Sequence, residues 1–465
     1  MRKTPVPREL LLPLLLALST IAACTPGPDY VRPSQETPAA FKEAANWKQA
    51  SATEFAVEGK WWKLFQDPVL DGLEEQVIVD NQNLKLAEAQ YRAARASVDS
   101  ARSAFFPSVS AAASRTRSDN AVGLAPGTNY AASATLAWEV DVWGRIRRNV
   151  ESGEAKLQAS AADLAAARLS TQALLAQTYA QLRASDLQLD LLARTVTAYG
   201  RFLDLTKNRL QAGVAAPLDV AQAETQLATA QAQQIDLQNQ RAQTEHALAV
   251  LAGRPPAALS LPVAAALPTL PATPLLLPST LLEQRPDIIA AERRVAAANA
   301  QIGVAEAAWF PVLSLGGSVG YRNSSLAQLF DLPSRFWSLG PSLAVTLVDG
   351  GGRSAAVALA TAGYDQTVAT YRQTVLTAFQ EVEDNLAATR LLEQEAAAQA
   401  RALAAARRAR EIAENQYRAG INSALNVVTA QGAELAAEVS AIGIGNRRLQ
   451  AAIQLLKNAA GRLAP

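Results

Sequence analysis

The chain has 465 residues, enough for two or three ordinary domains, and its 43 Lys and Arg nearly balance its 42 Asp and Glu. Nothing in this balance suggests the clustered positive charge that nucleic-acid binding needs. One cysteine and one histidine exclude a disulfide framework or a Cys/His metal site within one chain, so we expect no cofactor and no metal. Hydrophobic residues reach 49% while aromatics stay at 6%, which favours closely packed long helices.

The first 23 residues are typical of a lipoprotein signal peptide. Basic residues precede an apolar run, 10–23, that is too short to span a bilayer. The run ends in Ile21-Ala22-Ala23-Cys24, which resembles a bacterial lipobox in which Cys24 carries palmitate or a similar acyl chain. A buried cysteine without a role is the alternative. Because Thr25 stands where an inner-membrane retention signal would have Asp, we expect a lipid-anchored protein of the outer membrane.

The mature chain is predicted to be a duplicated half. Phe106-Pro107, Asp141, Gly213 and Gly253-Arg254 recur in the second half, in the same order and at nearly constant spacing. After an extended segment, 24–66, we expect a first repeat at 67–254, a proline-rich linker at 255–279 and a second repeat at 280–465. Each repeat is predicted to contain a helix, a β-hairpin, a long helix and a further helix. The last three fall at 107–142, 145–211 and 217–252 in the first repeat, and at 311–348, 353–418 and 424–460 in the second.

The hairpins are predicted to cross a membrane. Apolar and small polar residues alternate along four runs of roughly ten residues, the length that a tilted strand needs to cross a bilayer. Aromatic residues gather at the strand ends, as in the girdles of membrane barrels, namely Trp143, Trp309, Phe310, Phe336 and Trp337. An ordinary half-buried sheet with core aromatics is the alternative.

The helices between the hairpins are predicted to be rods. No proline interrupts 145–211, and at 1.5 Å per residue this segment extends roughly 100 Å. Its counterpart, 353–418, has apolar residues in alternating steps of four and three, the seam of a coiled coil. The seam of the first rod repeats strictly every seven residues, at Leu175, Leu182, Leu189, Val196, Leu203 and Leu210.

Four strands cannot stand alone in a bilayer, because the edge strands would leave unpaired backbone groups in hydrocarbon. The chain must therefore oligomerise. Two copies would give eight strands, whose side chains fill the interior, whereas three give twelve and leave room for a channel. We favour a homotrimer whose helices continue the barrel as a cylinder into the periplasm.

Specific motifs strengthen this prediction. Pro28-Asp29-Tyr30-Val31-Arg32-Pro33, Trp61-Trp62, Arg285-Pro286-Asp287-Ile288 and Phe310-Pro311 make the chain resemble the TolC-like outer-membrane efflux proteins, specifically their lipoprotein branch. The resemblance covers essentially the whole mature chain. It implies a trimer with a twelve-stranded barrel above a helical barrel. It also implies two partners, a periplasmic adaptor protein and an inner-membrane pump, of the resistance-nodulation-division type.

The resemblance also implies a gate at the periplasmic end. A tyrosine on the second helix tip bonds an aspartate on the first tip in the family, and Tyr417 and Asp219 occupy those positions. A carboxylate that merely favours the start of a helix is the alternative for Asp219. The family's best-known members place two aspartates inside the entrance, where this sequence has Asn426 and Thr429. We therefore expect the cation-attracting field of a carboxylate ring to be missing.

The turns at the two helix tips are the predicted docking site for the adaptor. Each turn breaks a long helix at a glycine, Gly213 or Gly420, and carries one apolar residue, Val214 or Ile421. Plain helix C-caps are the alternative.

Other classes of protein fit less well. Gly316 to Gly320 match the G-x-S-x-G motif of hydrolases, but Ser318 falls within a predicted strand, and the sole histidine, His246, lies in a predicted helix. We expect no enzyme. A periplasmic coiled-coil protein would explain the heptads but not the two aromatic-flanked hairpins. Among channels, a type I protein-secretion duct is the alternative to small-molecule efflux.

Overall fold

The structure is a computed structural model that describes residues 25–35, 41–44, 60–120, 124–271 and 285–459. The predicted signal peptide and Cys24 lie outside the described residues. The chain divides into two compact units. The sheet unit comprises Met1–Gln35, Ala89–Ala162 and Ile289–Gln373, and the helical unit comprises Glu36–Glu88, Asp163–Ile288 and Thr374–Pro465.

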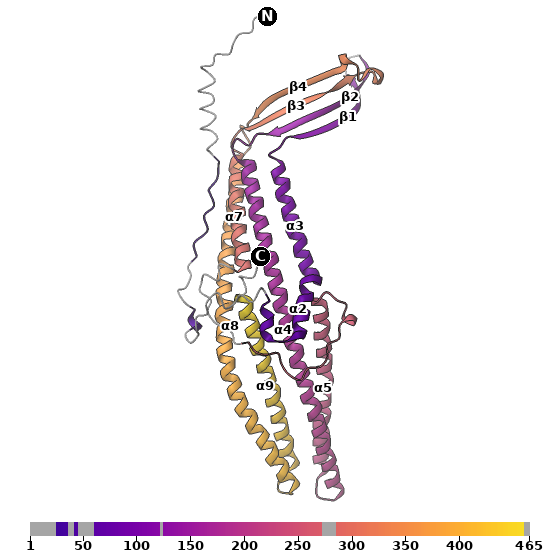
Figure 1. The fold of residues 1–465 in the computed structure, drawn as a ribbon, viewed down its shortest axis with the longest axis vertical. Coiled ribbons are helices and arrows are strands. Elements are labelled where there is room, and N and C mark those ends of the chain that lie inside the picture. The colour runs from indigo at the N-terminus through magenta and orange to yellow at the C-terminus, as the bar shows by residue number, and fades with distance from the viewer. Residues whose placement is uncertain (1–24, 36–40, 45–59, 121–123, 272–284, 460–465) are drawn as a thin grey trace. The chain divides into compact units, whose positions relative to one another are not determined.

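One order of elements occurs twice along the chain (Figure 1). Two short helical turns, η2 (Lys42–Ala44) and η3 (Trp61–Phe65), and helix α2 (Pro68–Asp80) precede the first copy. The first copy is α3 (Gln82–Ser103), β1 (Ser108–Asn120), β2 (Leu124–Glu139), α4 (Arg145–Gln211) and α5 (Pro217–Leu251). The second copy is α7 (Pro286–Ala307), β3 (Val312–Asn323), β4 (Arg335–Ala344), α8 (Gly352–Arg418) and α9 (Ala424–Ala459).

The two copies match closely in length. Helices α3 and α7 both have 22 residues, and helices α4 and α8 both have 67. The predicted fold class, a duplicated helix-hairpin-helix with long helices and four strands, is therefore confirmed.

The four strands form one antiparallel sheet in the order β1-β2-β3-β4, with the strands side by side in Figure 1. Strand β2 pairs with β3 although 172 residues lie between its last residue, Glu139, and the first residue of β3, Val312. That intervening segment contains helices α4, α5 and α7. Among the described strands, β1 pairs with β2 alone and β4 pairs with β3 alone. Their outer backbone edges are therefore open to pairing with another copy.

Strand β4 is shorter than the sequence alternation indicates. Its last residue, Ala344, pairs with Val312, which is the first residue of β3. Val345 and Leu347 continue the alternation but have no partner residue on β3, so the sheet ends before them.

Each hairpin passes into its long helix through an aspartate and a left-handed glycine. The carboxylate of Asp141 accepts hydrogen bonds from two backbone amides in the first turn of α4, both at 2.9 Å. Asp349 accepts from the backbone N–H of Arg353 at 3.0 Å in the same way. These bonds satisfy amides that have no partner within the helix. Gly144 (φ 76°) and Gly351 (φ 92°) supply the positive φ that the turns require.

The seams of the long helices are largely covered, although Leu189, Val196 and Leu210 of the predicted α4 seam are only half-buried. Leu175 and Leu182 of α4 are inaccessible to solvent, and Val375 and Val382 of α8 are also buried. The largest apolar cluster of the helical unit packs Trp61, Trp62 and Phe65 of η3 against α2 and the middle of α4. The rods are thus stabilised mainly by the burial of apolar side chains between helices.

One described helix, within Ala424–Asn458 of α9, is apolar enough by length and composition to cross a membrane. Two of its glutamates form ion pairs with α8: Glu434 lies 2.5 Å from Nε of Arg410, and Glu438 pairs with Arg407. Ion pairs of this kind favour a helix packed in an aqueous helical hairpin over one in hydrocarbon.

Candidate channel wall, helix tips and linker clamp

The register of the sheet separates its side chains into an apolar face and a small polar face. Directly paired residues point to the same side. Leu343 pairs with Leu313, Leu339 with Gly317 and Trp337 with Val319. Across all four strands, the apolar face carries Val109, Ala111, Ala113, Ala132, Ala134, Leu136, Trp138, Leu313, Leu315, Val319, Leu339 and Leu343. The opposite face carries Ser108, Ser110, Ser114, Ser133, Thr135, Ser314, Ser318, Ser338 and Ser342.

The apolar face is not covered by other parts of the chain, and most of the serine-rich face is exposed as well. Trp337 and Leu339 of β4 are 71% and 66% exposed in the chain. A half-buried sheet of an ordinary globular protein would cover these side chains. An apolar surface that runs over every strand, backed by serines, is instead the pattern of a membrane barrel with lipid outside and water inside.

Aromatic side chains lie at both ends of the sheet. At the end nearest the helices, the rings of Trp143 and Phe310 stack at 4.8 Å, and Trp143 Nε1 donates to the carbonyl of Pro311 at 2.7 Å. Phe336 and Trp337 lie at the other end, near the start of β4. Trp337 is on the apolar face and fits the predicted aromatic girdle, whereas Phe336 is on the serine-rich face.

The G-x-S-x-G match forms no nucleophile elbow. Ser318 lies within β3, and its hydroxyl is 2.8 Å from that of Ser338 on β4. His246 lies on α5 and belongs to the other unit. The described residues also contain no group of His, Cys, Asp and Glu that could hold a metal ion.

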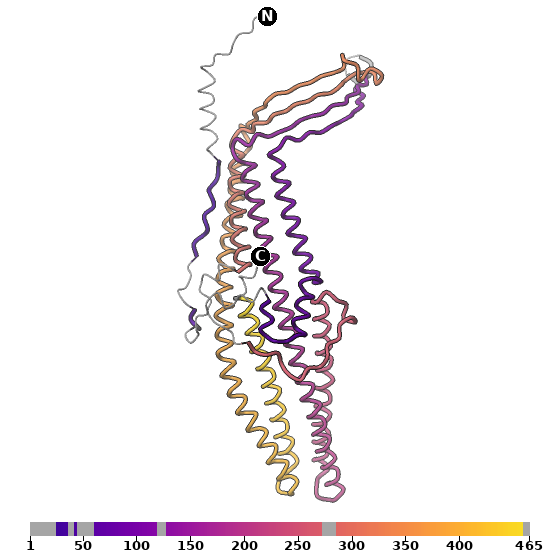
Figure 2. Tube along the Cα trace, in the orientation of Figure 1, coloured from indigo at the N-terminus to yellow at the C-terminus, as the bar shows by residue number. Residues whose placement is uncertain are grey.

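The turns α4–α5 and α8–α9 lie at the same end of the helical unit (Figure 2). Gly213 (φ 75°) and Gly420 (φ 76°) end α4 and α8 in the left-handed conformation. The next residues, Val214 and Ile421, donate back to the carbonyls of Arg209 and Gln416, both at 2.9 Å. These bonds complete the Schellman caps that glycine favours, so the C-cap interpretation of both turns holds.

The same turns nevertheless leave apolar side chains in solvent. In a Schellman cap, the residue after the glycine frequently packs against the residue five positions earlier. Those earlier residues are the polar Arg209 and Gln416, and Val214 and Ile421 remain 62% and 78% exposed. Capping alone does not account for these two apolar side chains.

Arg209 connects the two tips. Its Nη1 donates to the main-chain carbonyl of Tyr417 at 2.6 Å, and its guanidinium lies 4.6 Å from the centre of the Tyr417 ring. The same ring packs on Phe202 at 5.4 Å. Arg209 therefore satisfies a carbonyl in the last turn of α8 and holds that turn against α4.

The predicted gate residues have separate partners. Tyr417 is buried, and its hydroxyl lies 3.4 Å from Oγ1 of Thr206, whereas Asp219 accepts from the backbone N–H of Ala216 at 3.1 Å. Neither side chain makes the hydrogen bond to the other that the resemblance implies. Asp219 stabilises the first turn of α5, which is the alternative role considered for it.

Asn426 and Thr429 lie on the first two turns of α9, close to the second tip. Both are exposed; Asn426 donates to Asn422, and Thr429 donates to the carbonyl of Leu425 at 2.8 Å. Neither carries a charge, so these positions contribute no negative potential at this end of the helical unit.

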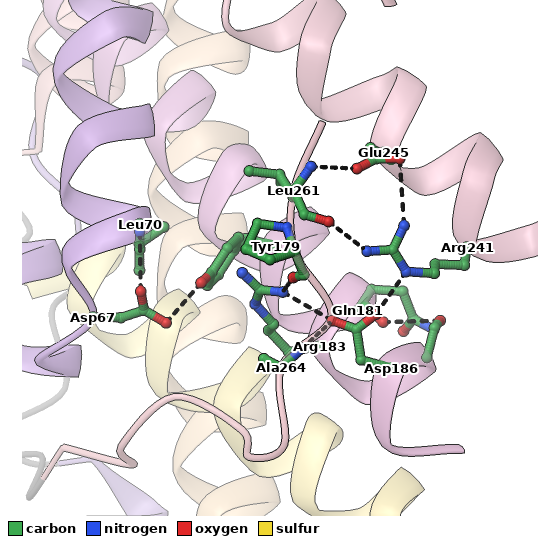
Figure 3. A network of polar contacts seen from close by, with 12 residues as sticks. Asp67, Leu70, Tyr179, Gln181, Arg183, Asp186, Arg241, Glu245, Leu261 and Ala264 are labelled. Carbon is green, nitrogen blue, oxygen red and sulfur yellow. Dashed lines mark hydrogen bonds and ion pairs between the residues drawn. The ribbon is translucent and has the colours of Figure 1, made fainter. Parts of the chain in front are cut away.

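A buried ionic network clamps the proline-rich linker to the helices (Figure 3). Asp186 of α4 is inaccessible to solvent and accepts from Arg183 Nη1 at 2.8 Å, Arg241 Nε at 2.6 Å and the backbone N–H of Ala264 at 3.1 Å. Arg183 also donates to the carbonyl of Pro262 at 2.8 Å, and Arg241 to that of Leu261 at 2.9 Å. The two arginines thus bind α4, α5 and the linker together.

The network continues toward α2. The guanidinium of Arg183 lies 4.6 Å from the ring centre of Tyr179, whose hydroxyl donates to Asp67 at 2.7 Å. Asp67 in turn caps the first turn of α2 by accepting from Leu70 N–H and its neighbour. The sequence alone does not reveal this clamp. Oppositely charged residues three positions apart, such as Arg183 and Asp186, are common on solvent-exposed helix faces. Only the position of this pair among the seam leucines indicates that it is buried.

The Arg285-Pro286-Asp287 motif lies at the start of α7 and connects this end of the helix to α8 and α9. Nη2 of Arg285 contacts Asp287 at 2.8 Å and Glu381 at 2.9 Å, and Nη1 donates to Asn458 at 3.2 Å. Burial raises the pKa of Asp287, but the hydrogen bonds from Arg285 outweigh it and hold the pKa below the ordinary value. The motif therefore has a structural role in the helical unit.

The residues that directly follow Cys24 lie along the sheet unit. Arg148 of α4 donates to Asp29 at 2.9 Å, and Asn299 of α7 donates to the carbonyl of Pro28 at 2.8 Å. A Cβ atom added to Gly144 would lie only 2.4 Å from Cγ2 of Thr25. Thr25 therefore contacts the turn between β2 and α4, at the base of the first hairpin.

Comparisons with known proteins agree with this geometry. The sequence model of the family described as outer membrane efflux protein matches twice, over residues 73–254 and 277–461. The chain belongs to this family. The two matches coincide with the two structural copies and confirm the duplication.

Relatives of this efflux protein are similar over nearly their full length. Outer membrane protein OprJ of Pseudomonas aeruginosa is 33% identical, with 96% of this chain and 95% of OprJ covered. The toluene efflux pump outer membrane protein TtgC of Pseudomonas putida is 32% identical, with 97% and 95% covered. The outer-membrane channel OprN superposes with a TM-score of 0.85 at 32% identity, covering 94% of this chain and 99% of that structure. The open state of the MtrE outer membrane channel of Neisseria gonorrhoeae gives 0.81 at 27% identity, covering 95% and 99%.

These findings confirm the predicted family and class of function. This efflux protein is an outer-membrane channel component of an efflux pump, and its relatives are transport proteins.

Proposed function

We propose that three copies of this efflux protein form a twelve-stranded barrel and a helical duct through which a partner pump expels small molecules. The observation that carries the proposal is the four-stranded sheet with one exposed apolar face, one serine-rich face and two open edges. Pairing β4 of one copy with β1 of the next satisfies those edges and leaves no unpaired strand in hydrocarbon. The names of relatives, which include toluene efflux and pyoverdine export, favour small molecules over secreted proteins.

The duct is tested by reconstitution of the purified full-length protein. We expect a trimer on unheated gels that dissociates on heating, and conductance steps in planar bilayers. A monomer in detergent that gives no conductance would contradict the proposal.

We further propose that acyl chains on Cys24 anchor the protein in the inner leaflet of the outer membrane. The supporting observation is that Thr25, the residue after the proposed attachment site, contacts the β2–α4 turn at the end of the sheet that leads into the helices. Each buried CH₂ of an acyl chain contributes about 0.8 kcal/mol to membrane binding.

Replacing the attachment residue tests the anchor. Cys24→Ser is expected to abolish labelling by a fatty-acid probe and to leave unprocessed precursor, while Thr25→Ser, the control, is labelled normally. Wild-type protein that is processed without taking up the probe would exclude the anchor.

The helix tips are proposed to dock the periplasmic adaptor through Val214 and Ile421. Both glycines have a positive φ, so a larger residue at either position would strain the turn by about 1–2 kcal/mol. A loss of docking in such a variant could not be separated from damage to the turn. The pair Val214→Asp and Ile421→Asp keeps the glycines and is expected to reduce adaptor cross-linking and drug resistance at least about tenfold, the order expected when an apolar anchor is lost. If cells that make the double variant show wild-type drug resistance and normal trimer levels, Val214 and Ile421 do not bind the adaptor.

The entrance is proposed to be held closed at the tips by Tyr417 and Asp219 through their separate contacts. The double variant Tyr417→Phe and Asp219→Ala is expected to raise single-channel conductance, because α8 and α5 lose contacts that fix their ends. Because Asn426 and Thr429 replace carboxylates, wild-type channels should resist block by trivalent cations, and Asn426→Asp should introduce it. Tight block of the wild type, or unchanged conductance of the double variant, would show that other residues close the entrance.

A further inference from the structure

Three arginines interrupt the apolar face of the sheet, and all three lie at one end of it. Arg115 and Arg117 lie on β1, and Arg335 is the first residue of β4. These positions are at the ends of the strands farthest from the helices. All three side chains are exposed, and none forms an ion pair with another side chain that the structure describes. We call these residues the arginine patch.

Tyrosines accompany the arginine patch on the same face. Arg115 pairs with Tyr130, and its guanidinium lies 5.7 Å from the centre of that ring. Arg335 pairs with Tyr321, whose ring meets Phe330 of the β3–β4 loop at 5.5 Å. Tyrosines of membrane barrels lie at the boundary between hydrocarbon and headgroups. The guanidinium groups beside them are therefore at headgroup depth.

The arrangement of the strands identifies the leaflet. The other ends of the strands lead into the helices, which project into the periplasm in the proposed duct. The arginine patch is consequently on the outer side of the membrane. Directly below it, on the way to the middle of the bilayer, the same face carries Trp337, Val319 and Leu339.

Closure of the proposed trimer would bring the arginines together. Arg115 and Arg117 are on one open edge of the sheet, and Arg335 is on the other. When β4 of one copy pairs with β1 of the next, all three share one face and one end of the seam between protomers. Strand β1 also carries Asp119, two residues after Arg117, so this end of the seam has three guanidinium groups and one nearby carboxylate in the sequence of its strands. The excess positive charge would be repulsive. An anion from outside the protein would remove this repulsion.

We propose that the arginine patch binds the phosphates of lipid A, the phosphorylated glycolipid of the outer leaflet, at each seam between protomers. Guanidinium groups bind phosphate oxygens bidentately and remain charged at all relevant pH values. The acyl chains of the same lipid would cover the apolar face beneath the patch. A lipid fits better than free phosphate because the charged and apolar surfaces are continuous. The inference rests on the proposed trimer, since one chain holds only part of each site.

The test measures lipid binding to the detergent-solubilised trimer by native mass spectrometry. Bisphosphorylated lipid A, phosphatidylethanolamine and inorganic phosphate are titrated separately. Wild-type trimer is expected to retain lipid A in preference to phosphatidylethanolamine. The triple variant Arg115→Ser, Arg117→Ser and Arg335→Ser is expected to bind lipid A roughly a hundredfold more weakly, the order expected for three arginines at an anionic lipid surface.

Arg322→Ser is the matched control. Arg322 follows Tyr321 at the same end of β3 but points to the serine-rich face, where its guanidinium lies 5.2 Å from the ring centre of Phe336. This variant is expected to bind lipid A as the wild type does. Equal binding by the triple variant, or equal retention of phosphatidylethanolamine by the wild type, would overturn the proposal. Displacement of lipid A by millimolar phosphate would reduce the patch to a general anion site and overturn it too. If trimers conduct but do not select lipid A, only this inference fails; if no trimer forms, the proposed duct fails as well.

Discussion

Leu339→Arg is expected to remove the folded trimer from the outer membrane. Leu339 lies in the middle of β4 on the exposed apolar face. Arginine at the middle of the lipid-facing surface of a barrel costs about 2–4 kcal/mol. In the proposed trimer the cost occurs three times, which exceeds what a marginally stable assembly tolerates. Outer-membrane fractionation and unheated gels measure the loss.

The neighbouring residue provides the matched control. Ser338→Arg places the same side chain one position earlier, on the serine-rich face, where Ser338 contacts Ser318. Trimers are expected to persist, and the added positive ring should shift the channel toward anions in planar bilayers. The opposite pattern, with Leu339→Arg tolerated and Ser338→Arg lost, would mean that the assignment of the two faces is reversed.

Asp186→Asn is expected to destabilise the helical unit by about 3–5 kcal/mol, because removing one partner of a buried ion pair leaves the other charge uncompensated. Here the uncompensated charges would be those of Arg183, which is 2% exposed, and of Arg241. Heat should dissociate the trimer at a lower temperature, and proteases should cut the released linker faster.

A surface ion pair one turn along α4 serves as the control. Asp190 lies 3.1 Å from Arg194, and both side chains are about two-thirds exposed, at 64% and 68%. Asp190→Asn should change stability by no more than about 0.5 kcal/mol. If the Asp186 and Asp190 variants dissociate at the same temperature, the clamp does not stabilise the unit.

The fold could be predicted because its signals are long and repeated. The heptad leucines placed α4, and the alternation of apolar and small residues placed the strands on which Val319 and Trp337 lie. Strand ends were less predictable. Val345 and Leu347 continue the alternating pattern, but β4 ends where β3 no longer provides a partner. Pairing is a property of two segments and is not contained in either one.

The candidate sites were only partly predictable. Glycine marked both helix tips, because Gly213 and Gly420 are needed for left-handed caps. Tyr417 contacts Phe202, Thr206 and Arg209, which lie on a helix more than 200 residues earlier. Because tertiary packing decides which residues of two distant helices meet, these partners could not be predicted from the sequence. The same limit hid the clamp, where Asp186 meets Arg241 and the linker.

The equal lengths of α4 and α8 restrict how this protein can evolve. Both rods have 67 residues and hold their partners through seams that repeat every seven. A single inserted residue would rotate everything beyond it by about 100° around the helix axis and turn seam leucines toward water. Tolerated changes in the length of the rods should therefore come as whole heptads and should appear in both halves of the gene together.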